Sequence, residues 1–353
     1  MKKLSVAVIG TGSIVSGGYL PALAKHPSVN VVALCDSVVE RAKLLADEYG
    51  IPRVLGTPEN VLNLSDLNAV LVCTPNHLHA PQTCKALEAG KHVLVVKPMA
   101  LSPEEGEAMV ETARKAGKTL MVGLSYRFHP HTQYMKRFVD SGDLGEIYYT
   151  KASWLRRKGN PGGWFTRKAL AGGGPLIDLG VHLIDTIWYL LGKPSCLSAT
   201  GSTYGKMNGH SSTLSAGYRS ADVKEGLDGG KEYDVEDLAC GFLRFANGVT
   251  LIMDTSFALH TKADAHDVEI FGTKGGGKLY PAEVYCDLHG TPADIAPVLP
   301  KVSNQELEVA EFVDSILQEK PSMCPGEDGL AVLKMIDALY RSSHVGQEVA
   351  VSD

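Results

Sequence analysis

Several common functional features are missing from this sequence. The seven cysteines are scattered and include no Cys-x-x-Cys pair, which indicates reduced thiols in a cytosol and not a disulfide framework. The formal net charge is −6, so basic surfaces for nucleic acid or anionic membranes are not expected. No signal peptide, membrane-length apolar run, internal repeat or low-complexity tract is visible. We therefore expect a cytoplasmic protein that binds neither nucleic acid nor membrane.

Motifs for nucleophilic, phosphoryl-transfer and zinc chemistry are also absent. The chain contains no nucleophile elbow, P-loop or zincin sequence. Two histidine pairs, His77 with His79 and His129 with His131, could each supply two metal ligands. Neither pair has a third ligand at a recognisable spacing, so no metal site is predicted.

The first positive signal is a strand, a glycine turn and a helix at the N-terminus. Leu4–Ile9 is an apolar, β-branched run typical of a strand buried on both faces. Gly10-Thr11-Gly12 ends this run, and a helical pattern begins near Ser13. Such a turn lets backbone approach a phosphate, and the helix N-terminus favours negative charge, so the segment predicts dinucleotide binding. The third glycine of the usual fingerprint is replaced by Val15.

An acidic residue follows at the position where a dinucleotide ribose is recognised. Asp36 comes 24 residues after Gly12, at the end of the second expected strand. Its carboxylate can accept hydrogen bonds from both ribose hydroxyls and repels a 2′-phosphate. Ser37 and the next two residues supply no arginine, and Arg41 lies one helical turn further on, so NAD is favoured over NADP. The alternative is that Asp36 simply caps the following helix.

The order of strand and helix signals predicts two domains, which suits a chain of 353 residues. In residues 1–124 the signals alternate, as in a doubly wound parallel sheet (α/β, Rossmann type) with ligands at its carboxyl edge. Residues 125–353 predict an α+β domain with a large, open, predominantly antiparallel sheet, and Asn247-Gly248 is a hairpin signal. The last two helices can pack back on the first domain. Strands are expected at 4–9, 30–35, 53–55, 69–73, 92–96, 119–122, 146–155, 196–204, 238–245, 250–256, 268–272 and 284–288, and helices at 14–25, 38–49, 58–62, 80–89, 103–116, 132–140, 306–319 and 328–344.

Two sets of polar residues stand in apolar surroundings and are candidates for chemistry. Lys97 directly follows the strand at 92–96, and because an unpaired buried ammonium is costly, it must pair with an acid or face a polar ligand. The alternative is a surface lysine at a strand end. The apolar helix at 176–191 carries one polar stripe at spacings i, i+4, i+7 and i+11: Asp178, His182, Asp185 and Tyr189.

This stripe suggests a helix that lines a wet cavity. Asp178 and His182 are one turn apart, so a hydrogen bond between them would orient the imidazole and raise its basicity. The pair would then act as a general base near neutral pH. The alternative is a core histidine satisfied by its neighbour.

Six segments spread over the chain form a recognisable set. They are Ala-Val-Ile-Gly-Thr-Gly at 7–12, Cys-Thr-Pro-Asn-His-Leu-His at 73–79, Gly-Lys-His-Val-Leu-Val-Val-Lys-Pro at 90–98, Tyr-Arg-Phe at 126–128, Trp164 with Ala-Gly-Gly-Gly at 171–174, and Asp-Leu-Gly-Val-His at 178–182. The set resembles the Gfo/Idh/MocA family, named for glucose–fructose oxidoreductase, inositol dehydrogenase and a rhizopine-catabolism protein. The resemblance implies hydride transfer between C4 of a nicotinamide and a sugar or polyol hydroxyl. It also implies a homodimer or homotetramer formed through the C-terminal sheet.

The same resemblance assigns roles to individual residues. Lys97 would contact the reacting hydroxyl and lower its pKa, His182 would be the acid/base, and Asp178 would hold His182 and contact the substrate. The Lys97–Pro98 bond is often cis in the family. With the turn and Asp36, the expected cofactor-binding residues are Gly10, Gly12, Ser13, Ile14, Asp36, Ser37, Arg41, Thr74, Pro75, Asn76, His79, Lys97 and Trp164. The expected substrate-binding residues are Lys97, Tyr126, Arg127, Asp178 and His182.

One residue departs from the family pattern, and three functions stay open. The glutamate that usually precedes the lysine is Val96 here, which removes a polar neighbour of the nicotinamide. The leading hypothesis is an NAD-dependent sugar or polyol dehydrogenase. The alternatives are an NAD-retaining glycosidase that acts by transient oxidation and elimination, and a non-enzymatic NAD-sensing regulator. The substrate is not fixed, because specificity is expected from loops such as 126–131, 156–171 and 205–234.

Overall fold

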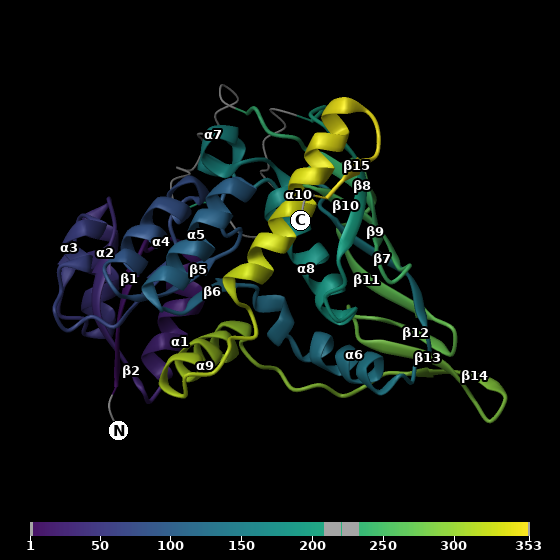
Figure 1. Ribbon diagram of the computed structural model, residues 1–353, viewed down its shortest axis with the longest axis horizontal. Helices are drawn as coiled ribbons and strands as arrows, with labels where there is room; N and C mark the ends of the chain where they lie inside the picture. Colours follow the sequence, from purple (N-terminus) through teal and green to yellow (C-terminus); the bar gives the residue numbers. More distant parts are fainter. Residues whose placement is uncertain (1–2, 208–219, 221–232, 352–353) are drawn as a thin grey trace.

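Two separate β-sheets, each with its own helices, make up the molecule (Figure 1). The structure is a computed structural model that describes residues 3–207, 220 and 233–351. Most of the polar loop expected over 205–234 therefore lies outside the described residues. Within the described part, no helix is long and apolar enough to cross a membrane.

The N-terminal sheet is parallel and buried on both faces. Its strands are β1 (Leu4–Ile9), β2 (Val29–Cys35), β3 (Val54–Leu55), β4 (Ala69–Val72), β5 (His92–Val96) and β6 (Leu120–Gly123). They are apolar runs because helices cover both sides of the sheet. The strand order is β3-β2-β1-β4-β5-β6. Successive strands of the chain are therefore added on one side of β1 up to β3, and then on its other side from β4 onward. The carboxyl ends of β1 and β4 thus form the switch point at which such sheets bind ligands.

Helices join these strands, and each expected helix is present. They are α1 (Leu20–Lys25), α2 (Val39–Tyr49), α3 (Pro58–Leu62), α4 (His79–Glu88) and α5 (Pro103–Ala116), with short 3₁₀ turns η2 (Asn76–Leu78) and η3 (Ser125–Phe128). The helix expected at 14–25 is not one regular helix, which corrects that prediction. It opens with a π-helical turn, η1 (Val15–Tyr19), and becomes α-helical only from Leu20.

The C-terminal sheet has nine strands and is mostly antiparallel. They are β7 (Ile147–Leu155), β8 (Cys196–Tyr204), β9 (Leu238–Phe245), β10 (Thr250–Ser256), β11 (Ala265–Gly272), β12 (Gly275–Lys278), β13 (Glu283–Leu288), β14 (Thr291–Ile295) and β15 (Val349–Ala350), in the order β14-β13-β12-β11-β7-β10-β9-β8-β15. One pair, β7 with β10, is parallel. The turn at Asn247-Gly248 joins β9 to β10 as predicted, with Gly248 at a positive φ of 83°.

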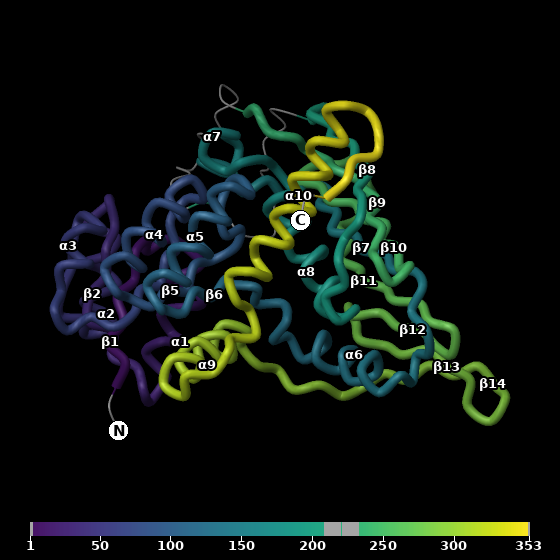
Figure 2. The backbone as a smooth tube through the Cα atoms, in the orientation of Figure 1, coloured from purple at the N-terminus to yellow at the C-terminus, as the bar shows by residue number. Residues whose placement is uncertain are grey.

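The remaining helices pack on this sheet, on one another or on the first domain. They are α6 (Pro130–Ser141), α7 (Lys168–Ala171), α8 (Val181–Leu190), α9 (Asn304–Leu317) and α10 (Gly326–Val345), with the 3₁₀ turn η4 (Gly163–Thr166) and the π-helical turn η5 (Leu176–Gly180). Helix α8 packs on β7, and α10 packs on β8 and also on α5 of the first domain. Helix α9 lies against α1 (Figure 2). The two C-terminal helices thus pack back on the first domain, as expected.

Candidate active site

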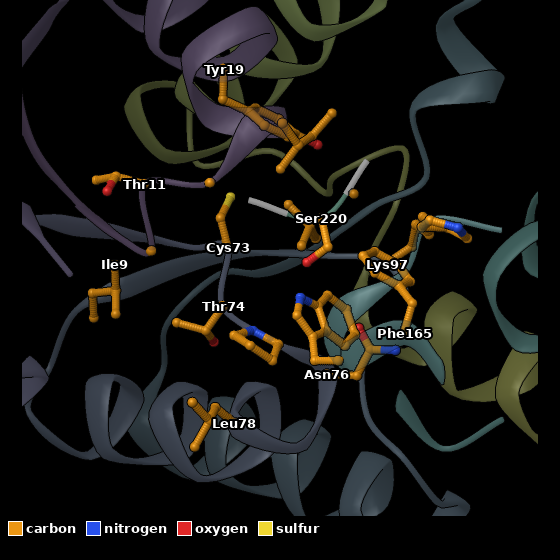
Figure 3. Close-up of a pocket in the computed structure, with 18 of the residues that line it drawn as sticks. Ile9, Thr11, Tyr19, Cys73, Thr74, Asn76, Leu78, Lys97, Phe165 and Ser220 are labelled. Atoms are coloured by element: carbon orange, nitrogen blue, oxygen red, sulfur yellow. The ribbon is translucent and has the colours of Figure 1, made fainter. Parts of the chain in front are cut away.

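A cavity of about 1080 Å³ lies between the carboxyl edge of the parallel sheet and the second domain. Thr11 lies toward one end of it, and Lys97 and Phe165 lie toward the other (Figure 3). Its wall contains the predicted residues Gly10, Gly12, Ile14, Asp36, Ser37, Arg41, Thr74, Pro75, Asn76, Lys97, Tyr126, Trp164, Asp178 and His182. Ser13, His79 and Arg127 were also predicted, but they are not part of this wall.

The glycine turn has the geometry that a bound pyrophosphate needs. Gly10 has a φ of +90°, and a Cβ atom there would lie 2.4 Å from the carbonyl oxygen of Cys73. Only glycine fits, because the turn presses against the end of β4. A Cβ atom at Gly12 would meet nothing within 4 Å, so the backbone on this side is open to the cavity. The turn therefore fits a dinucleotide.

Asp36 occupies the end of β2, and its carboxylate is already heavily hydrogen-bonded. Its Oδ2 accepts from the backbone nitrogen and hydroxyl of Thr11, at 2.8 and 2.6 Å, and its Oδ1 accepts from the Val38 nitrogen at 2.8 Å. Arg41 also reaches this carboxylate, with Nη2 2.8 Å from Oδ1. Burial raises the pKa of Asp36, but the hydrogen bonds from Arg41, Thr11 and Val38 outweigh it and lower the pKa below its ordinary value.

These contacts refine two predictions about this carboxylate. Arg41, expected near the cofactor although it lies one helical turn further along the chain, pairs directly with Asp36 and lines the cavity. The bond from the Val38 nitrogen does not cap α2, because the helix begins at Val39 and its N-cap, Val38, has no side-chain capping bond. The alternative that Asp36 simply caps this helix is therefore wrong, and Asp36 lines the cavity as an ionised group.

Two predicted cofactor residues hold loops in place. Asn76 donates from Nδ2 to the carbonyl of Ala171 at 2.8 Å, which ties the first domain to the glycine-rich loop of the second. The ring of His79 is fully buried, with Nδ1 2.7 Å from the carbonyl of Pro98 and Nε2 2.8 Å from that of Thr74. Burial lowers the pKa of His79 to about 4, although the contacts with the two carbonyl groups raise it. A neutral imidazole has one N–H and therefore donates to one of these two oxygens only. His79 lies behind the cavity wall, between the loop after β4 and the loop after β5.

Lys97 projects from the end of β5 toward the second domain. Its Nζ donates to both the side chain and the backbone of Asp178, at 2.7 Å to Oδ1 and 2.8 Å to the carbonyl oxygen. The Lys97–Pro98 bond is cis, as the family resemblance implies. Lys97 thus both pairs with an acid and lines the cavity, and the reading as a surface lysine is wrong.

The expected hydrogen bond between Asp178 and His182 is not formed among the described residues. Asp178 lies in the π-helical turn η5, which changes the α-helical spacing on which that prediction depended. Its carboxylate is instead used by Lys97, since an ammonium is a stronger partner for a carboxylate than a neutral imidazole. The predicted rise in basicity of His182 is therefore corrected.

His182 is 8% exposed and lies among aromatic rings. The Tyr126 ring centroid is 4.6 Å from that of His182, and the Trp154 centroid is 5.8 Å away. Burial, and then the charges of Lys97 and Arg156, lower the pKa of His182 well below 6.5. The imidazole is consequently neutral at physiological pH and free to accept a proton.

Arg127 lies in a different place from the one predicted. Its side chain is fully buried, with Nη2 2.6 Å from Oδ1 of Asp185 and Nη1 bonded to Asp328, which also pairs with Lys193. The Tyr189 ring centroid is 5.2 Å from Cζ of Arg127. The polar stripe of the helix is therefore divided: Asp178 and His182 face the cavity, whereas Asp185 and Tyr189 face this ion cluster.

Trp154 and Arg156 are among the cavity residues that were not predicted, although the sequence held a signal for both. Trp154 and Arg156 lie at the end of β7 and line the cavity next to His182. Alternation along a strand places positions 152, 154 and 156 on one face, and Ala152 is buried. A tryptophan and an arginine that continue the buried face of a strand to its end indicate a ligand site in the same way as Lys97, which directly follows a buried strand.

Known proteins match this chain along most of its length. The model of the oxidoreductase family with an NAD-binding Rossmann fold, GFO_IDH_MocA, matches residues 4–124, and the GFO/IDH/MocA C-terminal domain matches residues 132–277. D-glucoside 3-dehydrogenase of Escherichia coli (strain K12) is 36% identical over 349 residues, which cover 98% of this chain and 97% of that protein. For scyllo-inositol 2-dehydrogenase (NAD(+)) of Bacillus subtilis (strain 168), the identity is 30% over 354 residues, covering 97% and 95%.

The solved structures agree with the sequence comparison. The crystal structure of aldose-aldose oxidoreductase from Caulobacter crescentus, complexed with glycerol, has a TM-score of 0.84 and 27% identity, and the match covers 99% of this chain and 100% of that one. The chain belongs to the Gfo/Idh/MocA family of oxidoreductases.

Proposed function

We propose that this protein is an NAD-dependent dehydrogenase that transfers a hydride between a secondary hydroxyl of a sugar or cyclic polyol and C4 of the nicotinamide. One observation carries the proposal: Lys97 of the first domain and His182 of the second line the same cavity as the glycine turn and Asp36. Thr11 of that turn, which bonds to Asp36, lies toward the opposite end of the cavity from Lys97 (Figure 3). A cavity of this volume has room for a dinucleotide with a small polar substrate.

The bound cofactor supplies the hydride acceptor, and the protein supplies the rest of the chemistry. Gly10, Gly12 and Asp36 hold the nucleotide. Lys97, fixed by its two bonds to Asp178, donates to the reacting hydroxyl oxygen and stabilises the negative charge that develops there. Neutral His182 accepts the hydroxyl proton as the hydride leaves the carbon.

Names of the relatives suggest the first substrates to test, because two of them are dehydrogenases of D-glucosides and of scyllo-inositol. Purified protein with NAD and a panel of glucosides and inositols should produce NADH, followed by its near-ultraviolet absorbance. Release of aglycone without net NADH would instead support the glycosidase. No turnover of any compound, combined with NAD-dependent release of a protein partner, would support the regulator.

Removing the Asp36 carboxylate should weaken NAD more than NADP. Asp36→Ala is expected to raise the dissociation constant for NAD by about 10–100-fold, since a hydrogen bond to a charged group is worth roughly 1.5–3 kcal/mol. Binding of NADP should be unchanged or tighter, because the repulsion of its 2′-phosphate is removed while Arg41 remains. Fluorescence titration with both reduced cofactors measures this, with the exposed Asp66→Ala as the control. Equal weakening of both cofactors would exclude the role in discrimination.

The low pKa of His182 determines the acid side of the pH profile. For alcohol oxidation the imidazole must be neutral, and burial with Lys97 keeps it neutral to well below pH 6.5. We therefore expect kcat/KM for oxidation to stay level as the pH falls through 6.5, and to decline only well below that value. A profile that declines with an apparent pKa at or above 6.5 would contradict His182 as the buried base.

A further inference from the structure

Arg156 lines the cavity, but the proton transfer and cofactor binding proposed above give it no role. It follows β7, two positions after Trp154, and lines the cavity. Its Cζ lies 5.6 Å from the centroid of the Trp154 ring, and that centroid is 5.8 Å from the His182 ring, so the guanidinium lies at the reacting end of the cavity.

The side chain is held in one orientation by its surroundings. Nη1 donates to the carbonyl of Gly159 at 2.8 Å, and Cζ lies 5.6 Å from the centroid of the Trp154 ring. A Cβ atom at position 159 would lie 2.3 Å from Cδ of Arg156, so glycine at this position makes room for the arginine stem. A planar guanidinium fixed in this way loses little further freedom when it binds a ligand.

In the part of the chain that the structure describes, the guanidinium of Arg156 has no acidic partner. Among the described residues, no carboxylate forms an ion pair with Arg156, and the cavity carboxylate of Asp178 is used by Lys97. Only one guanidinium nitrogen is engaged by the Gly159 carbonyl. The donors that remain belong to a rigid fork at the wall of the substrate end of the cavity, and such forks bind two oxygen atoms side by side.

We propose that Arg156 is a substrate-binding residue that donates paired hydrogen bonds to two neighbouring oxygen atoms of the sugar and thereby determines substrate specificity. This inference rests on the proposed function. Two chemical groups present oxygens in this way: a vicinal diol of a neutral glycoside and the carboxylate of a uronide. The alternative is that Arg156 only stabilises the loop at 156–159.

The test compares Arg156→Gln and Arg156→Lys with the wild-type enzyme on matched substrates. These are methyl β-D-glucopyranoside, its 2-, 3-, 4- and 6-deoxy analogues, and the corresponding methyl glucuronide. Arg157→Gln is the control, because Arg157 is exposed and donates to the carbonyl of Lys262. NADH binding, followed by fluorescence, shows whether the cofactor end of the cavity is intact in each variant.

We expect Arg156→Gln to lower kcat/KM about 10–100-fold on the preferred substrate and to leave NADH binding unchanged. The loss should be smaller on each analogue that lacks one of the two recognised oxygens, and Arg156→Lys should not restore the wild-type preference, because it lacks the fork. A vicinal diol is identified when the deoxyglucosides at two adjacent positions each reduce the effect. A carboxylate is identified when the glucuronide is the preferred substrate of the wild type and shows the largest loss of kcat/KM in Arg156→Gln.

Other outcomes overturn the proposal in distinguishable ways. An equal loss of kcat/KM on every substrate, or no loss at all, would mean that Arg156 has no part in recognition even though the enzyme is a sugar dehydrogenase. If the wild-type protein oxidises none of the compounds and none raises the melting temperature of the NADH-bound form, the proposed function fails and the inference fails with it.

Discussion

Replacing His182 with asparagine should lower kcat for sugar oxidation by a factor of about 10²–10⁴, which is the usual contribution of a positioned general base. Asparagine keeps a polar group of similar size but cannot accept the proton. NADH should still bind, because Thr11 of the glycine turn, which bonds to Asp36, lies toward the opposite end of the cavity from Lys97 (Figure 3). Steady-state kinetics and NADH fluorescence titration measure the two effects separately.

Two further variants make this result interpretable. His344→Asn, at an exposed site near the end of α10, should be indistinguishable from wild type. Lys97→Met should also lose most turnover, because no cation then stabilises the developing alkoxide, although it leaves Asp178 without its partner. A His182→Asn enzyme with normal kcat on a turned-over sugar would reject this histidine as the base.

The second large effect concerns stability. Arg127→Met should lower the free energy of unfolding by about 3–5 kcal/mol, because removing one member of a buried ion cluster leaves the others uncompensated. Asp185 is almost fully buried, and Asp328 would keep Lys193 as its one cationic partner among the described residues. Urea unfolding followed by tryptophan fluorescence measures the loss.

A surface pair provides the matched comparison for this prediction. Arg53 pairs with Asp66 through Nη1 at 3.0 Å, and both side chains are at least 40% exposed. Arg53→Met should therefore change stability by no more than about 1 kcal/mol. If Arg127→Met had an equally small effect, the cluster would contribute little to holding α8 against η3 and α10.

The first domain could be predicted from sequence because its signals are local. Strands buried on both faces are apolar over their full length, and helices such as α5 end at a glycine with positive φ, Gly117. The second sheet was predicted only in part. Strand β12 begins with three glycines, which normally argue against a strand. A Cβ atom at Gly277 would lie 2.3 Å from Cε of Met135, so tertiary packing, invisible in the sequence, excludes larger residues.

The site shows the same division between local and tertiary information. The turn at Gly10, the acid at Asp36 and the lysine after β5 could be inferred because each stands at a strand end. The partners of Asp178 and Arg127 could not, since they come from segments distant in sequence: Lys97 is 81 residues from Asp178, and Asp328 is 201 residues from Arg127. The spacing along one helix suggested that Asp178 is the partner of His182. In the structure Asp178 pairs with the ammonium of Lys97, which attracts a carboxylate more strongly than a neutral imidazole does.

Other expectations are not tested by this structure. The homodimer or homotetramer, the role of the loop at 205–234 and the effect of Val96 in place of glutamate stay predictions. Val96 does line the cavity, so its influence on cofactor orientation can be addressed directly by Val96→Glu.

The path of the last fifty residues limits how the two domains can be separated. After the second sheet, α9 packs on the first domain, and α10 packs on both the first domain and the second sheet. Strand β15 then pairs with β8 of the second sheet. Exchange of the nucleotide-binding half between relatives would therefore need α9 and α10 to be transferred with it, or a chimera would carry mismatched contact surfaces. The same double anchoring restrains a wide hinge opening, so a sugar should enter by local rearrangement at the mouth of the cavity.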